Sequence, residues 1–149
     1  MNILIAGIGG PTPRSIAKRL REVYPNAKLI GVDANKKALG FYIKGLVDVS
    51  LVIPRATDSH YWDEIKNIIN KYEIDFAFIQ PEFEVTEWGN YLKSNGVFPC
   101  PTLIPPIEHI NALMNKARMA ELLAHSNYIP KTVTITQENQ DFELVENEI

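Results

Sequence analysis

Strand-like, mainly apolar runs alternate with helical patterns along the first hundred residues. The runs lie at residues 3–6, 28–32, 49–53, 75–79 and 97–98. Alternation of this kind is typical of βαβ units, in which parallel strands are buried on both faces and therefore look continuously apolar. We predict five strands that form one open parallel sheet.

Helical patterns separate several of these runs. The first is predicted to have Thr12 as its N-cap, with an apolar stripe opposite a basic face. The second begins near residues 58–59, and the third ends at Asn95-Gly96, a pair typical of a helix C-terminus. Because helices between parallel strands cover both sheet faces, the sequence predicts an α/β, Rossmann-like, three-layer open parallel sheet with strand order 3-2-1-4-5, followed by a short helical extension.

The alternation of strand and helix patterns ends after residue 99. Four prolines interrupt the chain, and two short helical patterns follow, the second with Asn115 as its predicted N-cap. Residues 132–135 form a strand pattern with no obvious partner. We therefore expect a Rossmann-like domain, then a helical linker with the start of a second domain, then a polar acidic tail; these cover residues 1–99, 100–135 and 136–149.

Composition suits a globular protein. The 149 residues are 46% hydrophobic and 22% charged, with a net charge of -3 that favours no nucleic-acid partner. The tail holds five of the 18 acidic residues and none of the 15 basic ones. No run approaches the roughly 18 apolar residues of a membrane span, and no basic segment precedes the apolar start, so we expect a cytoplasmic protein without membrane contact. The single cysteine and three scattered histidines predict no metal site.

Ligands bind to open parallel sheets beyond the strand carboxyl ends, where the strand order reverses. Here that crevice would lie between strands one and four, and the loops after these two strands should face each other. Gly7, Gly9 and Gly10 follow strand one and are candidate cofactor-binding residues, because glycine lets backbone amides approach a phosphate at a helix N-terminus. The same glycines could instead only turn the chain tightly. Asp33 ends strand two, where a ribose-binding acid would stand.

Two carboxylates follow strand four. Glu82 and Glu84 would lie near the position of a dinucleotide's pyrophosphate, which they would repel, so they suit an amine or a metal better. Either residue could instead point to solvent or begin the next helix, where acids favour the helix dipole. Together with Asp33, they are our candidate substrate-binding residues for a small amine-bearing compound.

The ordered features resemble the pre-ATP-grasp domain that opens ATP-grasp ligases. The matching segments of the first part are Ile3-Leu4-Ile5-Ala6-Gly7-Ile8-Gly9-Gly10, Leu29-Ile30-Gly31-Val32-Asp33-Ala34, Val52-Ile53-Pro54 and Gln80-Pro81-Glu82-Phe83-Glu84. Two later segments resemble the start of the ATP-binding part of the carbamoyl phosphate synthetase large subunit: Met114-Asn115-Lys116-Ala117-Arg118-Met119-Ala120-Glu121-Leu122-Leu123 and Tyr128-Ile129-Pro130-Lys131-Thr132-Val133.

This resemblance implies a reaction in which ATP phosphorylates a carboxylate and an amine or ammonia attacks the acyl phosphate. Lys116 would reach the nucleotide, although Asn115 stands where the family has an aspartate. The family's other ATP-binding lysine and its magnesium-binding carboxylates would lie beyond Ile149. We therefore expect ATP and Mg²⁺ as cofactors of the complete enzyme only, no tight cofactor binding by this chain alone, no catalytic residue in it, and an ATP-grasp domain as partner, in the same or a separate chain.

Two other functions stay open. The glycine loop and Asp33 are compatible with an NAD(P)-binding oxidoreductase domain, and the fold is equally compatible with a non-catalytic metabolite-binding module. The sequence leaves the substrate undecided, and it also leaves open whether the chain forms a homodimer.

Overall fold

The computed structural model describes residues 1–126, 128–130, 132 and 135. The chain divides into two compact units, Met1–Ile107 and Glu108–Ile149, and each is described by itself. The strand pattern at residues 132–135 falls largely outside the described residues, and the acidic tail at 136–149 lies wholly outside them. The three predicted domain ranges stay predictions.

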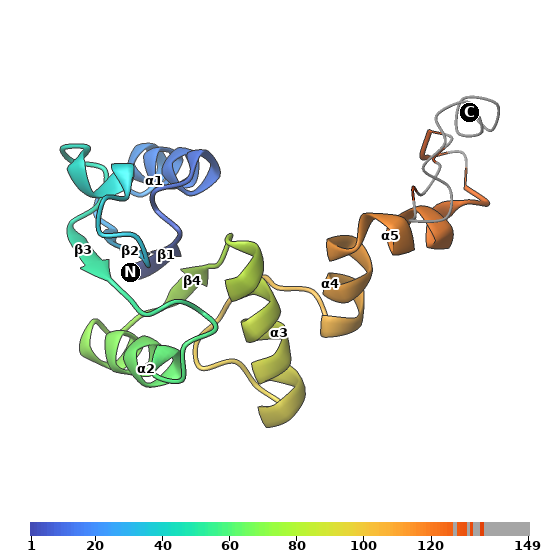
Figure 1. Cartoon of the computed structure of the whole chain (residues 1–149). Helices are drawn as coiled ribbons and strands as arrows, with labels where there is room; N and C mark the ends of the chain where they lie inside the picture. The colour runs from blue at the N-terminus through green and yellow to red at the C-terminus, as the bar shows by residue number, and fades with distance from the viewer. Residues whose placement is uncertain (127, 131, 133–134, 136–149) are drawn as a thin grey trace. The chain divides into compact units, whose positions relative to one another are not determined.

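The first unit is built on a four-stranded parallel sheet (Figure 1). Its order is β3-β2-β1-β4. The chain adds β2 and β3 on one side of β1 and then returns to add β4 on the other side, so the strand order reverses between β1 and β4. In this register Leu4 of β1 lies opposite Ile30 of β2 and Ala77 of β4. The predicted α/β class and the order of the first four strands are confirmed; the strands are β1 (Asn2–Ala6), β2 (Lys28–Asp33), β3 (Val49–Val52) and β4 (Phe76–Phe78).

The predicted fifth strand at Val97-Phe98 is wrong. These residues belong to no strand, and the chain reaches β4 only later, through a single parallel bridge between Ala77 and Thr102. There the Ala77 N–H donates to Pro101 O at 2.9 Å, and the Thr102 hydroxyl donates to Ala77 O at 2.8 Å. Pro101 has no N–H to give back to a ladder, which explains why the pairing ends after one bridge.

Helices cover both faces of the sheet. Figure 1 shows α1 (Pro11–Val23) on one side and both α2 (Tyr61–Lys71) and α3 (Glu82–Asn95) on the other, while a short 3₁₀ turn, η1 (Leu39–Tyr42), lies between β2 and β3. Helix α3 ends at Gly96, whose φ of 75° is left-handed, as the Asn95-Gly96 pair predicts.

Alternation along β1 supplies the two cores that hold these layers together. Ile3 and Ile5 pack with Ala17 of α1 in one apolar cluster. Leu4 and Ala6 face the opposite way and join the cluster that contains the buried residues of α2 and α3. All of these side chains are buried. Because successive side chains of a strand point to opposite faces of the sheet, β1 contributes to both cores, and helices pack on both faces.

The second unit contains α4 (Ile107–Met114), which starts at the unit boundary, and α5 (Lys116–Leu123). The predicted N-cap is confirmed, because the side-chain oxygen of Asn115 accepts a hydrogen bond from the Arg118 N–H at 3.1 Å. No helix in the described part of the chain is long and apolar enough to cross a membrane.

Candidate functional site

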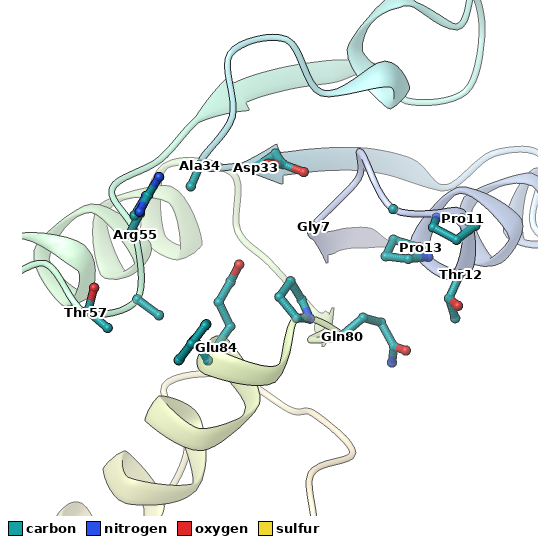
Figure 2. Close-up of a pocket in the computed structure, with 14 residues that line it drawn as sticks. Gly7, Pro11, Thr12, Pro13, Asp33, Ala34, Arg55, Thr57, Gln80 and Glu84 are labelled. Carbon is teal, nitrogen blue, oxygen red and sulfur yellow. The ribbon is translucent and has the colours of Figure 1, made fainter. Parts of the chain in front are cut away.

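A pocket of about 670 Å³ opens at the carboxyl ends of the strands. Residues from the loops after β1, β2, β3 and β4 line it, as Figure 2 shows. It therefore lies where the strand order reverses, which is the position that the topology predicts for a ligand. Its volume falls within the range of roughly 300–1,000 Å³ that small-molecule sites occupy.

The loops that follow β1 and β4 meet at Gly7 and Pro81. Gly7 has a φ of 68°, and a Cβ atom added there would collide with the Pro81 ring. Only glycine fits this conformation at this close approach without strain. The prediction that the two loops face each other is confirmed.

The backbone amides of the glycine loop are already used inside the protein. The Ile8 N–H donates to Val32 O at 3.1 Å, and the Gly10 N–H donates to Gly7 O at 2.8 Å. The Gly9 N–H donates to Oδ2 of Asp33 at 2.9 Å. A bound phosphate would have to compete with each of these hydrogen bonds, so the loop is a poor phosphate cradle.

The start of α1 offers few donors as well. Gly10, rather than the predicted Thr12, is the N-cap, and the helix begins at Pro11. Pro11 and Pro13 have no N–H, so Thr12 alone of the first three helical residues carries one. Because anion binding at a helix N-terminus depends on several free N–H groups, the geometry favours the interpretation of a tight turn. That Gly7, Gly9 and Gly10 bind a cofactor stays a prediction.

Asp33 lines the pocket but is occupied as a structural acceptor. Its Oδ2 atom holds the Gly9 amide, and its Oδ1 atom accepts from the Asn35 N–H at 2.8 Å. The carboxylate thus ties the end of β2 to the glycine loop. A direct role in substrate binding stays a prediction, and it would have to share these oxygens with the backbone.

Glu84 is the buried carboxylate of the site, with 6% of its surface exposed. The Tyr61 hydroxyl lies 2.8 Å from its Oε2 atom, and the Trp88 indole N–H donates to the Tyr61 oxygen at 3.0 Å. An indole nitrogen can only donate, so the Tyr61 hydroxyl gives its own proton to Glu84. Figure 2 shows the Glu84 side chain rising from the first turn of α3 into the pocket.

Burial controls the chemistry of this hydrogen-bonded chain. Loss of hydration raises the pKa of Glu84 to about 7; the Tyr61 hydrogen bond opposes this rise, and the nearby Asp33 charge adds to it. The pKa of Tyr61 is also raised far above its usual value, first by burial and then by the negative charge of Glu84. Tyr61 therefore stays a neutral donor, while Glu84 changes charge near neutral pH.

Glu82 lies elsewhere. It is the exposed first residue of α3 and does not line the pocket, although Phe83 and Glu84 do. An acid at this position interacts favourably with the helix dipole, which is the alternative that its sequence position also allows. The structure brings together Asp33, Glu84 and the glycine loop, and leaves Glu82 outside.

Arg55 is a pocket residue that sequence reasoning missed. It lies between Ile53 and Ala56, which are both buried in the core, so its exposed side chain stands over the pocket. In the part of the chain that the structure describes, its guanidinium has no hydrogen bond or ion pair. Its position directly after the third strand and Pro54 was the available signal, because that strand end borders the same crevice.

Lys116 belongs to the second unit. It is the first residue of α5, and its Nζ atom donates to Leu113 O at 3.4 Å. Its predicted contact with a nucleotide stays a prediction. Among the described residues, no group of three or more histidine, cysteine, aspartate or glutamate side chains could hold a metal ion.

Fold and site together define an α/β protein with a parallel sheet and a pocket where the strand order reverses. No protein-family model matches the sequence, and no curated protein matches it.

Proposed function

We propose that this chain is the substrate-side domain of an ATP-dependent carboxylate-amine ligase of the ATP-grasp type. Its pocket binds the amine-bearing, non-nucleotide substrate. Mg²⁺ and ATP bind to a separate ATP-grasp segment, in the same protein or in a partner chain. The pre-ATP-grasp resemblance supplies the reaction class, and the finer Rossmann-like assignment belongs to the same proposal.

The observation that carries the proposal is the buried Glu84 at the floor of the pocket. A carboxylate that has lost its water is stabilised best by a ligand that brings a positive charge, and an ammonium group does so with a charge-assisted hydrogen bond. The occupied amides of the glycine loop and the two prolines of α1 support the same conclusion, since they make the pocket unsuitable for a pyrophosphate.

The alternative of an NAD(P)-binding oxidoreductase rests on Asp33 and on the glycine loop. Asp33 does end β2, as in dinucleotide-binding folds. However, its two oxygens already hold the amides of Gly9 and Asn35, which leaves them less available to a ribose. The geometry therefore favours the ligase domain over the oxidoreductase.

Calorimetric titration of the full chain tests the proposal. The probes are a panel of primary amines and amino acids, a reduced nicotinamide dinucleotide, and magnesium-ATP. We expect saturable binding of at least one amine-bearing compound, loss of that binding in Glu84→Gln, and no micromolar binding of either nucleotide. Micromolar binding of the nicotinamide would overturn the proposal in favour of an oxidoreductase. Tight magnesium-ATP binding would contradict a nucleotide site outside this chain.

Glu22→Gln is the matched control for the charge removed in Glu84→Gln. Glu22 lies on α1 in an exposed ion pair with Arg19 and is not a pocket residue. Binding that falls equally in both variants would show a general effect of charge on the protein, and the role of Glu84 would be rejected.

A further inference from the structure

Two side chains of opposite charge type line the pocket from different elements. Arg55 lies in the loop after β3, and Glu84 lies in the first turn of α3. Figure 2 shows the Arg55 side chain beside Ala34 and the Glu84 carboxylate within the pocket. The two do not form an ion pair in the described structure, so neither neutralises the other.

The Glu84 carboxylate has one oxygen committed to the protein and one directed at the pocket. Tyr61 donates to Oε2. Among the described residues, the only fully enclosed side-chain nitrogen or oxygen without a partner is Nε of Arg21. The second oxygen of Glu84 is therefore not sealed in the core, and it is available to a donor in the pocket.

Arg55 is held in place by its backbone. Its neighbours Ile53 and Ala56 are buried in the core, and its carbonyl accepts the Asp58 N–H at 2.8 Å. The guanidinium itself has no partner among the described residues. A guanidinium presents a planar fork of N–H donors that matches the two oxygens of a carboxylate.

The third charged residue of the pocket, Asp33, is held by the backbone. Its oxygens are bonded to the backbone of Gly9 and Asn35. The pocket also offers an apolar surface, because Phe83 lines it with 71% of its surface exposed. The pocket thus presents an acceptor, a forked donor and an apolar wall.

We propose that the pocket binds an amino acid or a short peptide by its two charged ends, with the ammonium group on Glu84 and the carboxylate on Arg55. This inference rests on the proposed function, because it names the class of its amine-bearing substrate. The volume of about 670 Å³ leaves room for a side chain against Phe83 in addition to the two charged ends.

Binding to the full chain is measured by calorimetry with the standard amino acids and a set of dipeptides. For the tightest ligand of this panel, two analogues follow: the amine without the carboxylate and the acid without the amine. O-phosphoethanolamine is the additional arm, because a phosphate could occupy the guanidinium fork in place of a carboxylate. We expect the intact dipolar ligand to bind roughly tenfold tighter than either analogue, and tighter than O-phosphoethanolamine.

Variants assign each end of the ligand. Arg55→Gln should weaken the dipolar ligand by roughly tenfold and leave the carboxylate-free amine unchanged. Glu84→Gln should weaken both the dipolar ligand and the amine by roughly a hundredfold. The surface pair on α1 supplies the matched controls Arg19→Gln and Glu22→Gln, which should change neither affinity.

The outcomes separate the two proposals. If amines bind through Glu84 but the carboxylate adds no affinity, or if Arg55→Gln weakens the amine and the dipolar ligand equally, the two-ended ligand is wrong and the proposed function stands. Tighter binding of O-phosphoethanolamine than of any amino acid would also overturn the carboxylate assignment. If no member of the panel binds, both proposals fail.

Discussion

Replacing Glu84 by glutamine should stabilise the protein at alkaline pH while removing its ligand-binding charge. Glutamine keeps an oxygen that can accept the Tyr61 hydrogen bond, but it never ionises. In the folded protein, burial raises the pKa of Glu84 from 4.5 to about 7. One pKa unit corresponds to about 1.4 kcal/mol, so above pH 7 the buried charge destabilises the folded protein by about 3 kcal/mol.

The direction with pH follows from proton binding. Between pH 4.5 and about 7 the folded protein keeps the Glu84 proton that the unfolded chain has lost. The free energy of unfolding of the wild-type protein should therefore fall as pH rises through this window, and Glu84→Gln should lack that fall. The gain of the variant over the wild type should grow by about 2 to 3 kcal/mol from pH 5 to pH 8.

Urea denaturation followed by circular dichroism measures both proteins at the two pH values. Glu22→Gln is the control, because it removes a carboxylate that is half exposed and lies outside the pocket. A gain that is the same at pH 5 and pH 8 would refute the reasoning, since it would mean that Glu84 titrates equally in the folded and unfolded protein.

Three further predictions concern the same pocket. Tyr61→Phe leaves the buried Trp88 N–H without its acceptor, so it should lower the free energy of unfolding by about 1 to 3 kcal/mol. The same variant removes the hydrogen bond that stabilises the Glu84 carboxylate, so it should raise the pKa of Glu84, measured by carbon NMR of the carboxyl group. Gly7→Ala should destabilise more than Gly45→Ala in urea denaturation, because both glycines have a positive φ but only Gly7 abuts Pro81; equal losses would contradict this contact. Amine binding should release close to one proton below pH 6 and none at pH 8, which calorimetry in buffers of different ionisation enthalpy detects; proton release that is independent of pH would exclude Glu84 as the amine acceptor.

The strands of the sheet could be predicted because the signal for each strand is local, while their order followed from the fold class that alternating strands and helices indicate. Each strand of the first unit is a short apolar run, and alternate residues such as Ile3 and Leu4 enter opposite cores. The prediction of a fifth strand was wrong because the hydrophobic pattern does not show which residue pairs with β4. Val97-Phe98 has strand composition, but the residue that reaches β4 is Thr102, between two stretches of proline-rich chain.

The site was predictable in location but only partly in composition. Topology alone placed Glu84 and the glycine loop at the crevice. Glu84 points into the pocket and Glu82 points to solvent because they lie on different sides of a helix that begins at Glu82. The sequence does not reveal this exact starting residue. The role of the Tyr61 hydroxyl depends on the packing of α2 beside α3 on one sheet face, which the sequence does not reveal.

The fixed direction of the Trp88–Tyr61–Glu84 chain has a consequence for the protonated form of the site. Because Oε2 of Glu84 accepts from Tyr61, a proton taken up by Glu84 is placed more favourably on the other oxygen. The pocket then faces its ligand with a carboxylic O–H group instead of an anion. A pH change across about 7 thus inverts the hydrogen-bonding polarity of the pocket floor: alkaline conditions select ligands that donate there, and acidic conditions select ligands that accept.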